Sequence, residues 1–202
     1  MKDKLLIIGA GGHGRVVADI AEATGKYSEI AFLDDGVIEK IPRFPVLGGS
    51  AIAVEKKTEY EVIVAIGNSK VRNKIMENLD VDFAILIHPA AVIGSEVSIG
   101  EGTVIMPGAI VNTGSNIGKG VIINTASSVD HDCEIGDYCH VAVGAHLCGN
   151  VQVKEHTWIG AGATVIQGTE ICDNCMIGAG AVVVKKIEEA GIYVGVPARR
   201  NI

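Results

Sequence analysis

A six-residue repeat runs without interruption through the second half of the chain. From Ile87 to Val183, every sixth residue is aliphatic. The series comprises Ile87, Ile93, Ile99, Ile105, Val111, Ile117, Ile123, Val129, Ile135, Val141, Leu147, Val153, Ile159, Val165, Ile171, Ile177 and Val183. A small residue commonly stands four positions after each aliphatic one, often preceded by glycine. This pattern is typical of a hexapeptide-repeat parallel β-helix, in which the aliphatic side chains fill the interior of a prism.

The repeat predicts a left-handed parallel β-helix over residues 87–202, including a C-terminal tail beyond Val183. Three hexapeptides make one triangular coil, so residues eighteen apart are stacked at roughly the ~4.8 Å spacing of neighbouring strands. This stacking rule predicts which outward side chains meet.

Residues 1–86 read as α/β units that form a nucleotide-binding, Rossmann-like domain. Short apolar runs at 5–8, 30–33 and 62–66 predict strands, and 83–87 predicts a fourth. Helical patterns follow the first run up to about Gly25 and the third run from Asn68 or Ser69 to Leu79. Strands alternating with helices indicate a parallel sheet. The stretch 37–58 has no clear period and is expected to be a loop with a short helix.

Composition excludes several partners and compartments. A net charge of −7 and an aromatic content of 4% argue against binding to a nucleic-acid backbone or to stacked bases. No apolar run approaches the length of a membrane helix, and the short apolar run Leu5 to Ile8 before Gly9 is too short for a signal peptide. Five cysteines, an odd number, favour reduced thiols. We therefore expect a cytoplasmic protein without membrane insertion.

Gly9, Gly11 and Gly14 form a glycine-rich turn between the first strand and the first helix. With Asp34 twenty residues after Gly14, the spacing fits a dinucleotide-binding turn. The domain is about half the size of a full dinucleotide domain, so we expect one nucleotide, with phosphate near the helix N-terminus. His13 lies within this turn. The alternative is a tight strand-to-helix turn that binds no ligand.

His131 is the strongest catalytic candidate because Asp130 and Asp132 flank it. Its hexapeptide position predicts an outward imidazole, and a neighbouring carboxylate raises its basicity, as a general base requires. Gly149 lies eighteen residues on, stacked over His131, where an approachable backbone N–H suits an oxyanion. The alternative is a simply solvated histidine.

Other histidines and cysteines leave further hypotheses open. His140 lies half a coil from His131, so the two meet only between neighbouring subunits. His146 and His156 also lie in the repeat, so a metal site between subunits is considered. A lone C-x-x-C motif spans 172–175, where the repeat itself already predicts a small inward residue.

Several separate motifs together resemble the bacterial hexapeptide sugar acetyltransferases. The closest likeness is to UDP-4-amino-sugar N-acetyltransferases that make UDP-N,N′-diacetylbacillosamine, and sialic-acid O-acetyltransferase-like proteins are near relatives. The motifs are the glycine turn 9–14, Phe32-Leu33-Asp34-Asp35, Ala65-Ile66-Gly67-Asn68, Asn124-Thr125, His131-Asp132-Cys133 and Gly195-Val196-Pro197-Ala198. They agree in order and spacing over nearly the whole chain.

This resemblance implies a homotrimer with its active site between adjacent prisms. His131 matches the catalytic base, and Asp132 matches the acid that raises its basicity. The UDP-amino-sugar would be bound by Gly11, Gly12, His13, Asp34, Asp35 and Gly67, and acetyl-CoA by His140, Gly149, Ala161 and Ala179. No metal is implied. Family members often carry glutamate beside the histidine, so it stays open whether Asp130 or Asp132 orients the ring, and segment 36–60 leaves the sugar open.

The sequence therefore predicts an acetyl-CoA-dependent N-acetyltransferase acting on a nucleotide-activated amino sugar in glycan or polysaccharide biosynthesis. Lys185, Lys186, Arg199 and Arg200 are candidates for the CoA phosphates, although solvated surface charge explains them equally well. Three alternatives remain: O-acetylation of a sialic acid or polysaccharide sugar, a zinc-dependent carbonic anhydrase on the same kind of trimer, and a non-catalytic scaffold.

Overall fold

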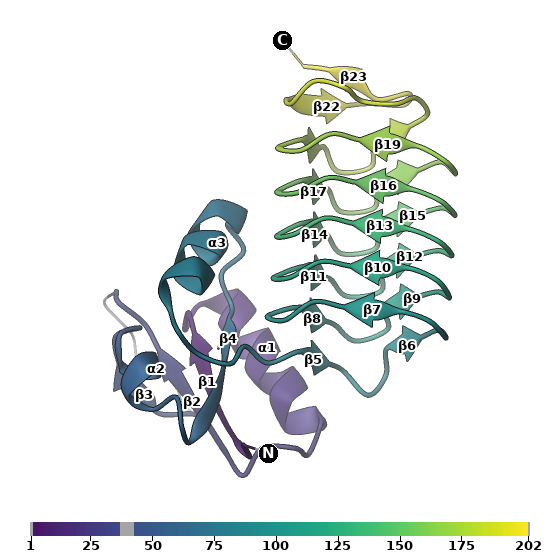
Figure 1. The fold of residues 1–202 in the computed structure, drawn as a ribbon. Helices are drawn as coiled ribbons and strands as arrows, with labels where there is room; N and C mark the ends of the chain where they lie inside the picture. The colour runs from purple at the N-terminus through teal and green to yellow at the C-terminus, as the bar shows by residue number, and fades with distance from the viewer. Residues whose placement is uncertain (1, 37–42, 202) are drawn as a thin grey trace.

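The computed structural model describes residues 2–36 and 43–201 and shows an α/β unit followed by a parallel β-helix (Figure 1). The predicted fold class is confirmed. The part of the 37–58 stretch that covers residues 37–42 lies outside the described residues. Figure 1 places the C-terminus at the end of the β-helix farthest from the α/β unit.

The α/β unit is a four-stranded parallel sheet in the order β3-β2-β1-β4. Its elements are β1 (Lys4–Ile8), α1 (Gly12–Ala23), β2 (Glu29–Leu33), β3 (Val46–Gly48), α2 (Ile52–Glu55), β4 (Tyr60–Val64) and α3 (Ser69–Asn78). All four apolar residues 5–8 of β1 are buried, as expected for a central parallel strand that is covered on both faces. Among the described residues no helix could span a membrane, and α1, the longest, has 12 residues.

Two sequence predictions about this sheet were wrong. The fourth strand is β3, which lies in the stretch expected to be only a loop and a short helix; α2 is that helix. Residues 83–87 do not form a strand of this sheet. Phe83 makes a single bridge to Val62, and Leu86 and Ile87 form β5, which pairs with β8 of the β-helix. Apolar composition marked the segment as a strand but did not identify its partner.

Seventeen two-residue strands, β5 to β21, make the three sheets of the β-helix. The domain-facing sheet contains β5 (Leu86–Ile87), β8 (Val104–Ile105), β11 (Ile122–Ile123), β14 (His140–Val141), β17 (Trp158–Ile159) and β20 (Met176–Ile177), extended by β22 (Ile192–Val194) and β23 (Arg199–Arg200). The second sheet contains β6 (Val92–Ile93), β9 (Ile110–Val111), β12 (Ser128–Val129), β15 (His146–Leu147), β18 (Thr164–Val165) and β21 (Val182–Val183). The third contains β7 (Ser98–Ile99), β10 (Asn116–Ile117), β13 (Glu134–Ile135), β16 (Gln152–Val153) and β19 (Glu170–Ile171).

The register of the β-helix follows the sequence repeat. Each aliphatic position from Ile87 to Val183 is the second residue of its strand, and residues eighteen apart are paired, as Val129 is with Leu147. From Ile105 onward these side chains are almost fully buried in one continuous core. The small corner residues, including Cys133, Cys139 and Cys175, are buried in the same core, so packing accounts for these three thiols.

The corners of the β-helix contain a second periodic feature. At every sixth residue from Glu96 to Gly180 the backbone adopts a left-handed conformation, with φ between 53° and 73°. Glycine, which tolerates this conformation, occupies eight of the fifteen positions, whereas the other seven carry side chains. Asp132, Tyr138 and His156 are among those seven.

The two units share packed surfaces. One cluster joins α1 and the sheet to Leu86, Val104, Met106 and Ile122 of the β-helix, and a second joins Met76 of α3 to Tyr138. Between them, Arg72 of α3 is completely buried. Its guanidinium donates to the carbonyl oxygens of Gly120 at 2.6 Å and Tyr138 at 2.8 Å in the β-helix, and to that of Ile66 at 2.6 Å in its own domain. Arg72 therefore fixes α3 against the domain-facing sheet.

Candidate active site

His131 lies on the corner between the second and third sheets, with 49% of its side chain exposed. The outward orientation predicted from the repeat is confirmed. Its Nδ1 is 2.8 Å from Oδ2 of Asp132, and this hydrogen bond raises the pKa of the imidazole above its ordinary value. The carboxylate has no proton to donate, so Nδ1 carries the proton and Nε2 is left with its lone pair. Nε2 is therefore available as a base.

Gly149 lies directly beneath the His131 ring. A Cβ atom at Gly149 would lie 2.5 Å from His131 Nε2, so only glycine lets the ring occupy this place. The Gly149 amide N–H donates to no group within the described part of the chain. The predicted stacking is confirmed, and it places a free backbone donor next to the basic nitrogen.

The two acids beside His131 have different contacts. Asp132 contacts the ring, whereas Oδ1 of Asp130 accepts from the His131 backbone N–H at 2.9 Å and from Asn112 Nδ2 at 2.8 Å. These bonds, led by the one from Asn112, lower the pKa of Asp130. In this geometry Asp132 orients the imidazole and Asp130 holds the backbone beneath it.

The glycine turn after β1 is open on its outer side. A Cβ atom at Gly11 or Gly12 would meet nothing within 4 Å, whereas one at Gly14 would lie 1.9 Å from the carbonyl oxygen of Gly9. Gly14 therefore serves helix–strand packing, and the exposed backbone at Gly11 and Gly12 is free to approach a ligand. His13, in the same turn, is largely buried; burial and then the charge of Arg72 lower its pKa to about 4.

Asp34 and Asp35 shape the loops at the carboxyl end of β2. Asp34 Oδ2 accepts from the Ala10 N–H at 2.7 Å, which ties the glycine turn to this strand. Asp35 accepts from both the backbone N–H and the hydroxyl of Ser50, and these bonds lower its pKa. Asp35 is exposed. Both carboxylates lie at the same edge of the sheet as Gly11 and Gly12, because parallel strands end together there.

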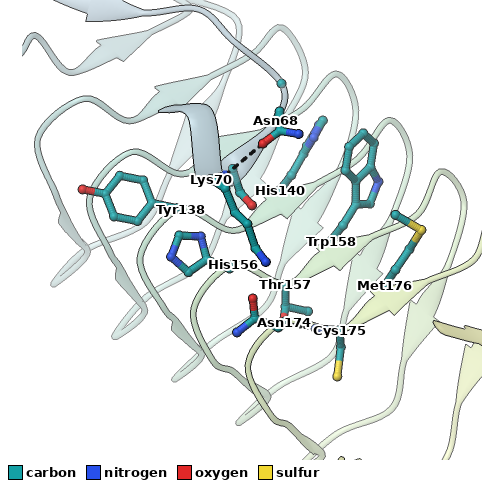
Figure 2. A pocket seen from close by; sticks show the side chains of 12 residues that line it. Asn68, Lys70, Tyr138, His140, His156, Thr157, Trp158, Asn174, Cys175 and Met176 are labelled. Carbon is teal, nitrogen blue, oxygen red and sulfur yellow. Dashed lines mark hydrogen bonds between the residues drawn. The ribbon is translucent and has the colours of Figure 1, made fainter. Parts of the chain in front are cut away.

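A cleft lies between the start of α3 and the domain-facing sheet, and its volume is about 290 Å³. Figure 2 shows the side chains that line it. His140, Trp158 and Met176 follow one another along its floor from β14, β17 and β20. Gly67, which is open to the cleft, and Asn68 stand on the opposite side, where the Asn68 side chain caps α3 by accepting from the N–H of Lys70. The predicted site residues Gly67 and His140 thus border the same cleft.

Sequence reasoning did not select several residues of this cleft. They include Lys70, Tyr138, Thr157, Trp158 and Asn174, and His156 was considered only for a metal site between subunits. The eighteen-residue stacking rule groups Trp158 and Met176 with His140, so the signal was present. What the repeat did not indicate is that α3 covers this part of the sheet. That placement depends on Arg72.

The residues matched to acetyl-CoA are divided between two corners. Gly149 is beside His131, whereas Ala161 and Ala179 lie on the corners that follow β17 and β20, on the other edge of the second sheet. His140 lies on the domain-facing sheet. Within one chain, His131 therefore does not face His140, as the half-coil spacing predicted.

The basic residues at the C-terminal end line a separate pocket of about 340 Å³. Lys186 is paired with Glu170 at 3.0 Å, and Arg200 with Glu189. Lys185 and Arg199 have no ion-pair partner among the described residues. Two of these four positive charges are thus paired with carboxylates of the same chain.

The described residues contain no group of three or more His, Cys, Asp or Glu side chains placed to hold a metal ion. In the C-x-x-C motif the sulfur atoms of Cys172 and Cys175 are 3.5 Å apart. Burial raises the pKa of Cys175 to about 12, which keeps it as a thiol at neutral pH.

Family models match both parts of the chain. Residues 4–79 match the PglD N-terminal domain, and residues 150–185 match the bacterial transferase hexapeptide repeat. Among curated proteins, the chain is 37% identical over 112 residues to a UDP-N-acetylbacillosamine N-acetyltransferase of Bacillus subtilis; this match covers 49% of each chain. The chain thus matches about half the length of that curated relative.

Solved structures match over nearly the whole chain. The acetyltransferase domain of PglB from Neisseria gonorrhoeae in complex with acetyl coenzyme A is 41% identical, with a TM-score of 0.96 and full coverage of both chains. PerB from Caulobacter crescentus, in complex with CoA and GDP-perosamine, is 34% identical with a TM-score of 0.91, covering 98% of this chain and 97% of PerB. The similarity therefore includes both units and their connection.

Proposed function

Since the chain belongs to the hexapeptide-repeat sugar acetyltransferases that carry a PglD-type N-terminal domain, we propose that it transfers the acetyl group of acetyl-CoA to the amino group of a UDP-linked amino sugar. The observation that carries this proposal is the arrangement of His131, hydrogen-bonded to Asp132 and seated on Gly149. It supplies a base and an oxyanion donor at one place.

The reaction needs one base and no covalent acyl-enzyme. The sugar amine attacks the thioester carbonyl carbon while Nε2 of His131 removes its proton. The carbonyl oxygen becomes negative and accepts the free N–H of Gly149. When the C–S bond breaks, the imidazolium returns the proton to the CoA thiolate. Asp132 holds the ring and stabilises its positive charge between these steps.

The proposed substrate sites follow the open surfaces of the α/β unit. UDP would be bound across the carboxyl ends of β1, β2 and β4, at Gly11, Gly12, His13, Asp34, Asp35 and Gly67, with the sugar directed toward the cleft of Figure 2. Acetyl-CoA would lie along the β-helix at His140, Ala161 and Ala179. Lys185 and Arg199 would meet its phosphates.

We propose a homotrimer because one chain separates His131 from His140 and from Ala161 and Ala179. A neighbouring prism would bring its His131 to this chain's cleft. Sedimentation equilibrium at micromolar protein should give three times the chain mass. A stable monomer with full activity would contradict this arrangement. Because both substrates are cytoplasmic metabolites, we also place the enzyme in the cytoplasm.

The direct test is turnover. A panel of UDP-amino-sugars is incubated with acetyl-CoA, and free CoA thiol is measured. A 4-amino sugar should release thiol and gain an amide. Release only with sugars that lack the amine would indicate O-acetylation instead, and release with none would contradict the proposal.

Nucleotide binding has its own test in Asp35→Ala. This variant should weaken UDP binding in calorimetry while leaving acetyl-CoA binding unchanged. Ser50→Ala is the matched control, since it removes the hydroxyl that contacts Asp35 but keeps the carboxylate. Tight NAD binding without a response to UDP would contradict the nucleotide assignment.

A further inference from the structure

His140 is almost completely buried although its side chain points out of the β-helix. Only 8% of the residue is exposed, because the α/β unit covers this part of the domain-facing sheet. Its ring packs against Trp158, with ring centres 4.5 Å apart. His140 borders the cleft of Figure 2, so the protonation of its ring affects how a ligand in that cleft is bound.

Asn124, one coil below, contacts the His140 ring through its side-chain amide. A second hydrogen bond of this amide, to the backbone, determines which way the amide faces. Oδ1 of Asn124 accepts from the backbone N–H of Thr125 at 2.7 Å. The amide nitrogen Nδ2 is therefore turned toward His140, 3.0 Å from Nε2. The amide orientation is thus set by the backbone, and Nδ2 can only donate.

This contact determines the tautomer of His140. Because Asn124 donates, Nε2 of His140 must accept, and the neutral ring carries its proton on Nδ1. Nδ1 is buried and has no hydrogen-bond partner among the described residues. A buried N–H without an acceptor is costly, so it points to a group that arrives with a ligand.

The surroundings keep this ring neutral. Burial, then the charges of Arg72 from α3 and His13 from the glycine turn, lower the pKa of His140 to about 3. Asn124 and Trp158, which contact the ring directly, are uncharged. His140 is therefore a neutral group at physiological pH, in contrast to His131, whose pKa is raised.

We propose that Asn124 is a positioning residue that fixes His140 in the Nδ1-protonated form, and that this N–H is a preset donor to an uncharged oxygen of the ligand in the cleft. The lone pair of Nε2 is engaged by Asn124, so His140 does not compete with His131 as a base. The identity of the ligand rests on the proposed function. The oxygen belongs to acetyl-CoA, as a carbonyl, or to the sugar, as a hydroxyl.

The tautomer is tested on the ligand-free protein by ¹⁵N NMR of labelled histidine. The His140 signals are assigned as those missing from a His140→Asn variant. The wild type should show a protonated Nδ1 and an unprotonated Nε2, unchanged between about pH 5 and 9. Asn124→Asp, which replaces the donor by an acceptor, should move the proton to Nε2. Asn116→Ala, an exposed asparagine on the third sheet, should change nothing.

The donor is tested by placing a single amide at either ring position. In His140→Asn the amide nitrogen lies near the place of Nδ1, and in His140→Gln near that of Nε2. Both variants alter the binding site, so they are compared with each other: the Gln variant should raise one KM about tenfold more than the Asn variant does, the loss of one hydrogen bond. Whether that KM belongs to acetyl-CoA or to the UDP-amino-sugar identifies the oxygen. Circular dichroism checks that both variants fold.

The outcomes separate this inference from the proposed function. A protonated Nε2 in the wild type would overturn the tautomer assignment, and equal KM values for the Asn and Gln variants would overturn the donor. If no sugar is acetylated, calorimetry with CoA, acetyl-CoA and UDP replaces the kinetics, while the NMR result stands independently. Equal affinities of both variants for all three ligands would again overturn the donor.

Discussion

The β-helix and the α/β unit position their functional groups in different ways. In the β-helix one contact pattern recurs in every coil, and the proposed catalytic corner is an ordinary corner that carries two unusual residues, His131 and Asp132. In the α/β unit, contacts such as those of Arg72 and Asp34 occur once each. The comparison teaches that a repeat fixes where a side chain points, whereas unique contacts fix which surfaces meet.

The largest expected effect tests the repeat. His131→Ala should lower acetyl transfer by ~10²–10⁴-fold, because the proposed general base is lost. The side chain is outward and exposed, so no core cavity forms and thermal stability should stay unchanged. Steady-state kinetics and a melting curve measure both. Gln152→Ala, another outward side chain, is the control. Wild-type kcat in His131→Ala would refute the mechanism.

Next, Arg72→Met tests the unique contacts of the α/β unit. The substitution removes the donors to Gly120, Tyr138 and Ile66 and leaves these carbonyls unpaired in the interface. We expect a loss of at least about 3 kcal/mol in the free energy of unfolding, measured by chemical denaturation. Lys74→Met, exposed on the same helix, should cost little. If the two variants unfold alike, Arg72 does not hold the units together.

Gly149→Ala tests whether activity depends on the position that Gly149 gives to the His131 ring in the neighbouring coil. The added Cβ would meet Nε2 and Cε1 of His131 at 2.5 and 2.6 Å, so the ring must move. A displacement of about 1 Å typically costs ~10²-fold in rate, and we expect a loss of that order in kcat. Cys148→Ala, the neighbouring position, should retain activity. An unchanged rate in Gly149→Ala would show that catalysis does not require the His131 ring at its observed position.

The smallest effect concerns the pH profile. The Asp132 carboxylate raises the pKa of His131, and the rate requires the neutral ring, so activity falls as the pH drops through that pKa. Asp132→Asn removes the charge and lowers the pKa. The acidic limb should move to lower pH while the maximal rate falls about 10-fold. Asp130→Asn should shift the limb less. The reverse order would assign the orienting role to Asp130.

The sequence predicted the β-helix closely because a single rule applies at every coil. The strand positions, the outward His131 and its stacking on Gly149 all follow from counting by six and eighteen. The same counting could not show that α3 covers His140, because that contact depends on Arg72, a single residue outside the repeat. Likewise β3 and the segment 83–87 were misassigned, since the partner of a short apolar run is decided by tertiary packing.

The left-handed corners of the β-helix bear on how such an enzyme changes in evolution. A side chain at such a corner costs roughly 1–2 kcal/mol relative to glycine, and one is present at Asp132, beside the proposed base, and at Tyr138 and His156, against α3. Each coil contacts only its neighbours, so a substitution at one corner is felt locally. New substrate preferences can therefore arise in the α/β unit and along the corners independently, while the aliphatic repeat keeps the coils in register.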